Sequence, residues 1–423
     1  MLIGKTLRRL ARLRGGGSAL PGLFVEKIEP GFLADALNQL PHGVVLVTGT
    51  NGKTTTTKLI AETLEAQGLR VFTNRTGSNF TRGVVAALIH EMDLSGILHY
   101  DIAILELDEA HAIHFVNQVK PTVSVLLNVM RDQLDRFGEI DYTTKLLTTI
   151  AENTTGTVVI NKSNPFTLSI AEHINGHIGL ATFDASAALQ PLFVSDLPAK
   201  PASNPKPLRH VRAEVVLETY EGQKATYTVD GKPVKATLSV TGHHNFLNAA
   251  AALATCLIVA PKVSARKLLN SMSEVMPAFG RGEVTTYNDI PLEFILVKNP
   301  AGFKSALVAS GREKHTHQTR IMIAVNDNYA DGRDMSWLWD VDFSPIKDQS
   351  IAMVTGSRAY DMALRLQYDN IRIGTVEVQL KKALSTFLKT NTEQQPMRIY
   401  CTYTAMLALR HHAMSMTSLE KAL

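Results

Sequence analysis

Short apolar runs alternate with stretches of helical periodicity over most of the chain, and this alternation predicts an α/β fold. The first run, "VVLV" at 44–47, is followed by a helical pattern that begins at Thr54. Continuous apolar runs of this length are typical of strands that are buried on both faces, as in parallel sheets. Similar runs form two groups, at 71–79, 101–109, 121–140 and 156–165 and then at 320–325, 350–356, 371–376 and 397–403. We therefore expect two mostly parallel sheets that bind ligands at the carboxyl ends of their strands.

The pattern changes between Ala185 and Val240. Residues 190–208 are rich in proline, and residues 225–240 alternate between apolar and polar positions on both sides of an Asp-Gly pair. This alternation around Asp-Gly predicts a β-hairpin inserted into the first α/β domain. The apolar run at 250–260 is too short to cross a bilayer and predicts a buried helix.

The sequence predicts three parts. A basic N-terminal arm occupies residues 1–40, and the first α/β domain, with its insertion, occupies residues 41–280. The segment "FGRGEV" at 279–284 is interpreted as a domain hinge, and a second α/β domain follows in residues 281–423. We find no internal repeat.

The turn after the first strand, "GTNGKTTT", has the composition of a phosphate-binding loop. Its two glycines permit a tight turn in which backbone N–H groups face an anion at the start of a helix. Lys53 would contact the outer phosphates, and the Thr54 hydroxyl would bind Mg²⁺. The segment matches the pattern G-x-x-x-x-G-K-[ST] except at Val47, which stands where the pattern has its first glycine. The alternative interpretation is an ordinary strand-to-helix turn with an exposed lysine. The residues expected to bind nucleotide here are Gly49, Thr50, Asn51, Gly52, Lys53, Thr54 and Thr55.

Polar residues at two later strand ends complete this candidate site. Glu106 ends the strand in "ILELDE", where a carboxylate suits Mg²⁺ beside substrate phosphates. Asp108 and Glu109 follow, and the alternative is that some of these carboxylates only solvate a loop. Asn128 ends the next strand, and the loop after it is crowded with charges, namely Arg131, Asp132, Asp135 and Arg136.

Composition narrows the class of protein. The chain has 423 residues, 45% of them hydrophobic, and can bury a large core. Its net charge of +4 is mild, so it gives no argument for a nucleic-acid partner. Two distant cysteines, Cys256 and Cys401, form neither a disulfide framework nor a zinc knuckle, which fits a reducing cytoplasm.

The first residues, "MLIGKTLRRLARLRGGG", combine apolar residues at helical spacing with basic residues that fall mostly elsewhere. One interpretation is a helix that lies against an anionic surface or ligand, including peripheral contact with a membrane. Others are an arginine-rich transit peptide and a basic helix that packs on the main domain with its charges in water.

Taken together, "GTNGKTTT", "ELDE", "LNVMRDQLDRFGE", "TGHHNFLNAAAA" and "GRGE" resemble the Mur ligase superfamily of ATP-dependent carboxylate–amine ligases. "LVKNPAGF" at 296–303 and the segment 325–343 are similar to the MurT family, the synthetase subunits of lipid II isoglutaminyl synthases. The resemblance spans nearly the whole chain. It implies a Mur ligase-type P-loop ATPase domain followed by a C-terminal Rossmann-like α/β domain.

The resemblance also implies a reaction, at the inner face of the cell membrane. Members of the family use ATP to phosphorylate the α-carboxylate of D-glutamate in lipid II. Ammonia from a GatD-type glutamine amidotransferase subunit then displaces the phosphate, which gives D-isoglutamine for peptidoglycan synthesis. Lys53 would contact the phosphates, Thr54 and Glu106 would serve Mg²⁺, and Asn128, Asn245 and Arg281 would contact the nucleotide. Such chemistry needs charge neutralisation and in-line positioning more than a protein nucleophile.

The segment "DGRD" is the least ordinary feature. Asp331, Arg333 and Asp334 follow a strand and precede two tryptophans, Trp337 and Trp339, which we expect to be exposed. One interpretation is a loop with an internal Asp–Arg pair and two core tryptophans. The resemblance implies instead that Asp334 completes the Cys–His site of the glutaminase partner, where an aspartate fixes the tautomer of a histidine.

Two departures from the family's pattern change the metal expectations. No cysteine lies between Ala185 and Val240, where many MurT-like proteins carry a four-cysteine zinc ribbon, so we expect no structural zinc. Gln133 stands where classical Mur ligases place a histidine, so a second Mg²⁺ site is not predicted.

Two other functions remain open at this point. One is a stand-alone amino-acid ligase of the Mur or folylpolyglutamate type, in which an amino acid attacks the acyl phosphate. The other is a non-catalytic ATP-binding scaffold for a glutaminase, against which the presence of Lys53, Thr54 and Glu106 argues.

Overall fold

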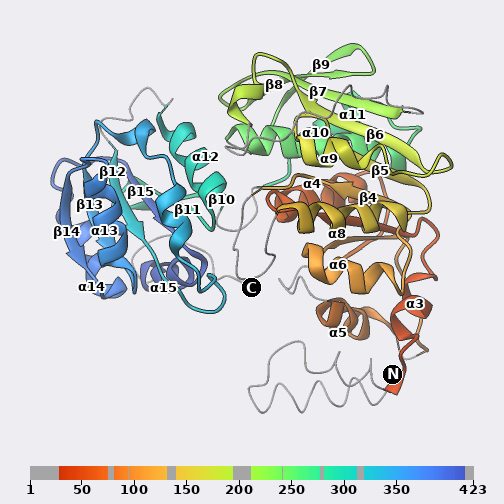
Figure 1. The fold of residues 1–423 in the computed structure, drawn as a ribbon, viewed down its shortest axis with the longest axis horizontal. Helices are drawn as coiled ribbons and strands as arrows, with labels where there is room; N and C mark the ends of the chain where they lie inside the picture. The colour runs from red at the N-terminus through yellow and green to blue at the C-terminus, as the bar shows by residue number, and fades with distance from the viewer. Residues whose placement is uncertain are drawn as a thin grey trace. The chain divides into compact units, whose positions relative to one another are not determined.

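The computed structural model describes residues 28–74, 81–93, 95–130, 140–193, 211–240, 242–276, 281–311 and 319–414. These residues form two compact units, one from residues 28–130 and 140–276 and the other from residues 281–414 (Figure 1). Each unit is built around one sheet with helices on both faces, which confirms the α/β prediction. The charged loop at 131–139, which contains Gln133, and most of the N-terminal arm lie outside the described residues, as does the proline-rich stretch from 194.

The first unit contains a nine-stranded sheet in the order β2-β3-β1-β4-β5-β6-β7-β8-β9. The strands from β2 to β7 in this order run parallel, and β8 and β9 are antiparallel to their neighbours. The strands span Val44–Thr48 (β1), Val71–Thr73 (β2), Ile102–Glu106 (β3), Val123–Leu126 (β4), Thr157–Asn161 (β5), Gly179–Ala185 (β6), Val211–Glu221 (β7), Lys224–Val229 (β8) and Lys232–Thr237 (β9).

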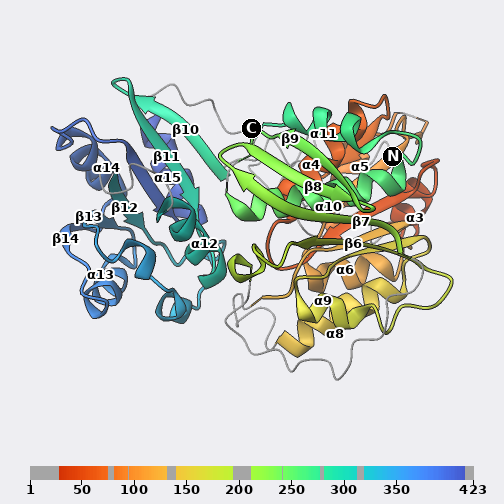
Figure 2. The ribbon, with the colours of Figure 1, turned by 90° about the horizontal axis from the view of Figure 1, so that it is seen from above.

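Helices cover both faces of this sheet. They span Phe32–Leu37 (α3), Lys53–Glu65 (α4), Thr81–Glu91 (α5), Glu109–Val116 (α6), Ile140–Glu152 (α8), Pro165–Ile170 (α9), His243–Val259 (α10) and Ala265–Ser273 (α11), with a 3₁₀ turn at Gln190–Leu192 (η1). Figure 2 shows α4, α10 and α11 on one side of the sheet and α6, α8 and α9 on the other. Alternate residues of β1 enter two cores, because Val45 and Val47 face α4 and α10 while Val44 and Leu46 face the other helices. This double burial explains why the strand reads as a continuous apolar run.

The insertion extends the sheet of the first unit. The predicted hairpin is confirmed, with Val229 paired to Lys232 across the turn. Asp230 and Gly231 have φ values of 45° and 80°, as a two-residue turn of type I′ requires. The strand β7, which pairs in parallel with β6 and antiparallel with β8, was not predicted, because the sequence does not show these pairing partners.

The second unit contains a six-stranded sheet in the order β10-β11-β15-β12-β13-β14. All neighbours are parallel except β10 and β11. The elements span Arg281–Tyr287 (β10), Ile290–Leu296 (β11), Pro300–Gly311 (α12), Arg320–Ala324 (β12), Ser336–Asp340 (η3), Ser344–Ile346 (η4), Ile351–Thr355 (β13), Ala359–Tyr368 (α13), Ile373–Glu377 (β14), Leu380–Lys389 (α14), Met397–Cys401 (β15) and Tyr403–Ala413 (α15). The four strands predicted in this unit are confirmed as β12 to β15, and β10 and β11 are additional.

The helices of the second unit cover opposite faces of its sheet. Phe303 of α12 and Leu366 of α13 share one core with the 3₁₀ turns, whereas Leu384 of α14 and Met406 of α15 share the other (Figure 2). The chain passes from β12 to β13 and β14 in one direction, and β15 pairs with the other side of β12. The loops after β12 and β15 therefore meet at a topological switch point, the usual place for a functional site in such sheets.

Within the described residues, no helix combines the length and the hydropathy that crossing a membrane requires.

Both cysteines are expected to resist thiol reagents in the native protein. Cys256 of α10 and Cys401 of β15 are fully buried, and burial raises the pKa of both thiols. Because the thiolate is the reactive form, a raised pKa and a closed core both slow modification. A colorimetric thiol assay at neutral pH should detect almost no reaction until denaturant is added, when both cysteines should react. Rapid modification of the folded protein would contradict this packing.

Candidate active site

The phosphate loop lies between two strands that each supply a polar residue. The central strand β1 pairs with β3 on one side and β4 on the other, with Val47 level with Glu106 and Thr48 level with Leu126. Glu106 ends β3 and Asn128 follows β4, so both residues lie directly beside the phosphate loop. This register explains how residues that are far apart in sequence meet at one edge of the sheet.

Two glycines give the loop its path. Gly49 has φ 126°, and a Cβ atom there would lie 3.0 Å from the backbone N and O atoms of Asn128. Gly52 has φ 92° and caps the start of α4, and its Cβ atom would lie 2.3 Å from the Asn248 Oδ1 atom. A side chain at either position would be strained in φ and would collide with a neighbour, so both positions require glycine.

Gly52→Ala is expected to destabilise the protein more than Gly68→Ala. Both glycines have φ 92°, but nothing lies within 4 Å of the Cβ position at Gly68. The control should therefore lose only the backbone term of about 1–2 kcal/mol, while Gly52→Ala adds a collision with a buried amide worth about 1–3 kcal/mol. Denaturant unfolding of the two variants measures the difference. Equal losses would show that the contact with Asn248 is not tight.

The Lys53 ammonium group is held by oxygen atoms. Its Nζ atom donates to the Gly49 carbonyl oxygen at 2.7 Å and to the Thr50 carbonyl oxygen at 3.5 Å, and it lies 3.1 Å from Asp108 Oδ1 and 3.7 Å from Glu109 Oε2. Lys53 is only 6% exposed, so the alternative of an ordinary turn with an exposed lysine is wrong. Asp108 and Glu109 do more than solvate a loop, because both carboxylates balance this buried charge. The ammonium group is thereby fixed beside the phosphate loop.

Thr54 and Glu106 form a second contact at the start of α4. The Thr54 hydroxyl donates to Glu106 Oε1 at 2.9 Å. The backbone of Glu106 is fixed in turn by Asn74, whose side-chain amide accepts from the Glu106 N–H at 3.0 Å and donates to its carbonyl at 2.8 Å. A hydroxyl and a carboxylate oxygen are therefore presented together, and hard oxygen ligands are those that Mg²⁺ prefers.

Asn128 forms hydrogen bonds with the backbone of the phosphate loop. Its side-chain Oδ1 atom accepts from the Asn51 N–H and its Nδ2 atom donates to the Asn51 carbonyl, both at 2.9 Å. Its own carbonyl accepts from the Thr50 N–H at 3.0 Å. The Thr50 hydroxyl accepts from the Met130 N–H at 3.0 Å. Asn128, predicted to contact nucleotide, thus clamps the loop that would do so.

The helix α10 packs against α4 beside the phosphate loop. Asn245 lies in its first turn and accepts a hydrogen bond from the Asn248 Nδ2 atom at 3.3 Å, and Asn248 in turn packs against Gly52. Thr55 is buried at the start of α4. Asn74 and Asn248 were not identified from the sequence, because amides at a strand end and inside a helix form no local motif. Arg281 begins β10 in the second unit, and its side chain lies outside what the structure describes.

The residues fit a nucleotide with its magnesium ion better than a metal held by protein alone. In the described part of the chain, no group of three or more His, Cys, Asp or Glu side chains could hold a metal ion. Mg²⁺ in phosphate sites commonly takes one or two protein oxygens and completes its shell with phosphate and water. Thr54 and Glu106 supply such a partial set next to the Lys53 ammonium group.

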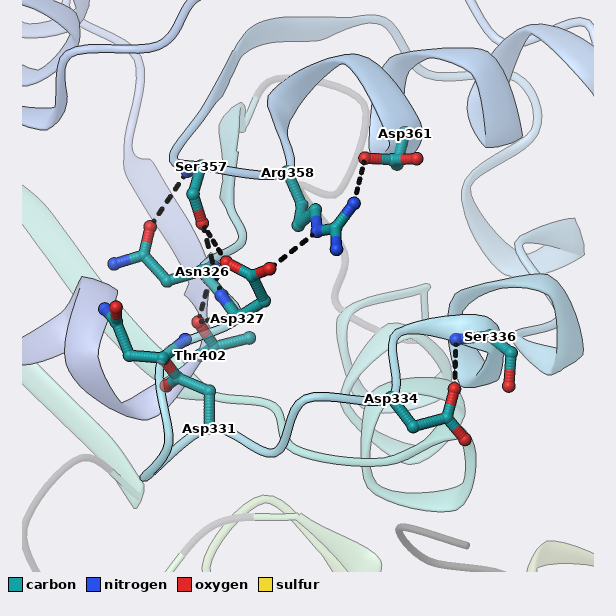
Figure 3. Close-up of polar contacts among 10 residues, drawn as sticks. Asn326, Asp327, Asp331, Asp334, Ser336, Ser357, Arg358, Asp361 and Thr402 are labelled. Atoms are coloured by element: carbon teal, nitrogen blue, oxygen red, sulfur yellow. Dashed lines mark hydrogen bonds and ion pairs between the residues drawn. The ribbon is translucent and has the colours of Figure 1, made fainter. Parts of the chain in front are cut away.

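In the second unit, Asp334 lies just before the start of η3 (Figure 3). Its Oδ1 atom accepts from the Ser336 N–H at 2.9 Å, and the side chain is partly exposed. No other hydrogen bond to this carboxylate is found among the described residues. Arg333 is exposed, and no ion pair joins it to an aspartate within the described residues, so the internal Asp–Arg pair is not seen. Trp339 is exposed as expected, but the expectation for Trp337 was wrong, because it is buried in the core beneath α12.

Asp331 anchors the loop that carries Asp334. It is buried, and its two carboxylate oxygens accept from the Thr404 N–H at 2.7 Å, the Thr404 hydroxyl at 2.5 Å and the Asn328 N–H at 3.1 Å. Thr404 lies in the first turn of α15. The loop after β12 is therefore tied to the segment after β15, across the switch point of the sheet.

A second polar network ties the loop after β12 to the start of α13 (Figure 3). Asp327 accepts from the Ser357 hydroxyl at 2.8 Å and from Arg358 Nε at 2.9 Å. The Ser357 hydroxyl bond and the Arg358 charge hold the pKa of Asp327 below its usual value. Asn326 accepts from the Ser357 N–H at 3.0 Å. This network was missed from the sequence, because its members come from two strands whose order in the sheet the sequence does not state.

Comparisons with known proteins find family matches in both units of the chain. The "MurT ligase C-terminal" family matches residues 296–406, and the "Mur ligase middle domain" family matches residues 47–256. The chain is 29% identical, over an alignment 442 positions long, to the lipid II isoglutaminyl synthase (glutamine-hydrolyzing) subunit MurT of Streptococcus pneumoniae, covering 97% of this chain and 95% of that one. It is 27% identical to the subunit of the same name from Staphylococcus aureus, covering 88% and 87% of the two chains.

A solved structure shows the same fold. The structure of MurF ligase from Thermotoga maritima in complex with ADP matches with a TM-score of 0.66 at 16% identity, covering 94% of this chain and 83% of that one. The predicted fold class is confirmed by this likeness.

Proposed function

Because the chain belongs to the MurT family of Mur ligase-like subunits, we propose that it is the synthetase subunit of a lipid II isoglutaminyl synthase. It amidates the α-carboxylate of D-glutamate in lipid II, in an ATP-dependent step of peptidoglycan synthesis. Its nitrogen comes from a GatD-type glutaminase subunit, and it works at the cytoplasmic face of the membrane, where lipid II is available.

The observation that carries this proposal is the contact between the Thr54 hydroxyl and the Glu106 carboxylate beside the buried Lys53. When bound, MgATP would supply the phosphoryl group that activates the substrate carboxylate as an acyl phosphate. Thr54 and Glu106 would hold the metal, and Lys53 would neutralise phosphate charge. Asn128 fixes the backbone of Thr50 and Asn51 before nucleotide arrives, so the phosphate loop needs little reorganisation when nucleotide binds.

The loop after β12 supports the glutaminase partnership. Asp334 keeps one carboxylate oxygen on the Ser336 N–H, which leaves the second oxygen able to accept from a histidine of another subunit. An aspartate in this role fixes the histidine tautomer and stabilises the imidazolium form.

Reconstitution tests the proposal. The full chain is incubated with MgATP, lipid II, isotope-labelled glutamine and a purified GatD-type glutaminase, and the lipid product is identified by mass spectrometry. Label in the D-isoglutamine amide, dependent on the glutaminase, is the expected result. Free ammonium at high concentration should replace glutamine and glutaminase together.

Other outcomes identify other functions. Transfer of an intact amino acid to lipid II, without need of a glutaminase, would indicate a stand-alone ligase. Absence of ATP hydrolysis with lipid II, ammonium and glutaminase all present would indicate a non-catalytic scaffold.

A further inference from the structure

The turn between β5 and α9 contacts the segment that follows β4. The two strands are parallel neighbours, so the segments after them leave the sheet at the same edge. Two asparagines of this turn, Asn161 and Asn164, are each only 4% exposed. Their side chains form hydrogen bonds with the backbone of residues 127 and 129, on either side of Asn128. Asn128, which contacts the phosphate loop, is thus itself bracketed by two buried amides.

The backbone on both sides of Asn128 has a partner in the β5–α9 turn. The Asn161 Nδ2 atom donates to the Leu127 carbonyl at 3.1 Å. The Asn164 Nδ2 atom donates to the Val129 carbonyl at 3.1 Å, and its Oδ1 atom accepts from the Val129 N–H at 3.4 Å. Asn164 therefore holds both polar backbone groups of the residue that follows Asn128.

Asn164 also caps the helix α9. Its Oδ1 atom accepts from the Thr167 N–H at 3.1 Å, and Pro165 follows at the first helical position. An aspartate or a serine would also cap this helix, because the cap needs only an oxygen acceptor. An amide is needed when the same side chain must also donate to a carbonyl, as Asn164 does to Val129. The choice of asparagine is therefore explained by the contact with Val129 and not by the helix.

Asn128 connects these contacts to the phosphate loop. Its side-chain amide bonds the N–H and the carbonyl of Asn51, both at 2.9 Å, and its own carbonyl accepts from the Thr50 N–H at 3.0 Å. Because these three bonds belong to one residue, a displacement of its backbone would weaken all of them. A phosphate loop binds best when its backbone is already in place before the ligand arrives.

We propose that Asn164 is a positioning residue for nucleotide binding, which acts through Asn128 on the phosphate loop. The inference rests on the part of the proposed function that places MgATP on this loop. It adds a residue whose own bonds go to the backbone of Val129 and to the start of α9. Since Asn164 orders the loop in advance, its loss should weaken nucleotide binding and leave the chemical step unchanged.

Asn164→Ser tests the inference, with Ser264→Ala as its matched control. A serine can still cap α9 but has no amide that donates to the Val129 carbonyl. Ser264 accepts from the Lys267 N–H at the start of α11, so Ser264→Ala removes a helix cap of the same unit without changing a bond to the segment after β4. Calorimetric titration of the full chain with MgATP should give a Kd about tenfold higher for Asn164→Ser and an unchanged Kd for Ser264→Ala. Ammonium-driven amidation at saturating MgATP should keep its kcat in Asn164→Ser.

Hydrogen exchange of the chain without nucleotide reports on the phosphate loop itself. The N–H groups of Thr50 and Asn51 are bonded to Asn128, so they should exchange about tenfold faster in Asn164→Ser than in the wild type. Asn164→Asp should show the same faster exchange, because its ionised carboxylate keeps the size and the cap but only accepts. Ser264→Ala should exchange at the wild-type rate in this loop. Thermal unfolding verifies that each variant is folded.

A double variant distinguishes action through Asn128 from a general loss of stability. Asn128→Ala alone should raise the Kd for MgATP, and adding Asn164→Ser should raise it by less than about twofold more, because the connection is already broken. Two independent effects that multiply would overturn the inference. An unchanged Kd in Asn164→Ser, with wild-type binding intact, would also overturn it and leave the proposed function standing. A wild-type chain that does not bind MgATP would overturn both.

Discussion

Glu106→Gln is expected to lower the rate of ATP-dependent amidation by about a hundredfold or more. A metal ion that neutralises phosphoryl charge is worth several kcal/mol, and each 1.36 kcal/mol is a factor of about ten in rate. Glutamine keeps the size of the side chain and can still accept from the Thr54 hydroxyl, which glutamate accepts at 2.9 Å. It removes the negative charge that would bind Mg²⁺. The initial rate of lipid II amidation, measured over a series of Mg²⁺ concentrations, reports the effect.

The fold should survive this change. The two backbone hydrogen bonds from Asn74 to Glu106 do not depend on the carboxylate. Glu62→Gln provides the control, because this residue lies on the same helix as Thr54, is partly exposed and pairs only weakly with Lys58 at 3.7 Å. It should amidate lipid II at the wild-type rate. Wild-type activity in Glu106→Gln would remove Glu106 from the metal site.

Asp334→Asn is expected to lower glutamine hydrolysis by the complex by about three to four orders of magnitude. Asparagine keeps the size and can still accept from the Ser336 N–H through its own Oδ1 atom, so the loop should keep its path. Its second group is an amide that donates, and it would face the N–H of the partner's histidine. The imidazolium form would lose its counter-charge. Glutamate release by the purified complex measures the loss.

The same variant should retain amidation driven by ammonium, because the phosphate loop belongs to the other unit. Its affinity for the glutaminase should also stay near that of the wild type. Asp348→Asn, at an exposed position in the same unit, should leave both activities unchanged. If Asp334→Asn instead abolished ammonium-driven amidation and kept glutamine hydrolysis, Asp334 would belong to the ligase reaction.

The sequence predicts those parts of the fold that have their own local pattern. The strand at 44–47 is visible because both of its faces are buried, and the hairpin is visible because Asp230 and Gly231 suit a turn that needs positive φ. By contrast, β7 and β11 carry no distinctive pattern, since each is defined by the strands it pairs with. Pairing partners are set by tertiary contacts that no short window contains.

The candidate site divides in the same way. Lys53, Thr54 and Glu106 are found from the sequence because a phosphate loop and a strand-end carboxylate have recognisable neighbours. The groups that hold them are not, since Asn74 reaches Glu106 from another strand and Asn248 reaches Gly52 from α10. Residues that support others through space have no fixed spacing in the chain. Trp337 was misjudged for a related reason, because its burial depends on α12 covering it.

The anchoring of the Asp334 loop has a thermodynamic consequence for assembly. Asp331 binds Thr404 and Asn328 through three hydrogen bonds within the chain itself, so the loop is ordered when the unit folds. Fixing the backbone of one residue costs about 1–2 kcal/mol of conformational entropy. This entropy is lost when the unit folds, so it is not lost again when another subunit binds. Docking by a loop that is already ordered favours rapid association with little structural adjustment.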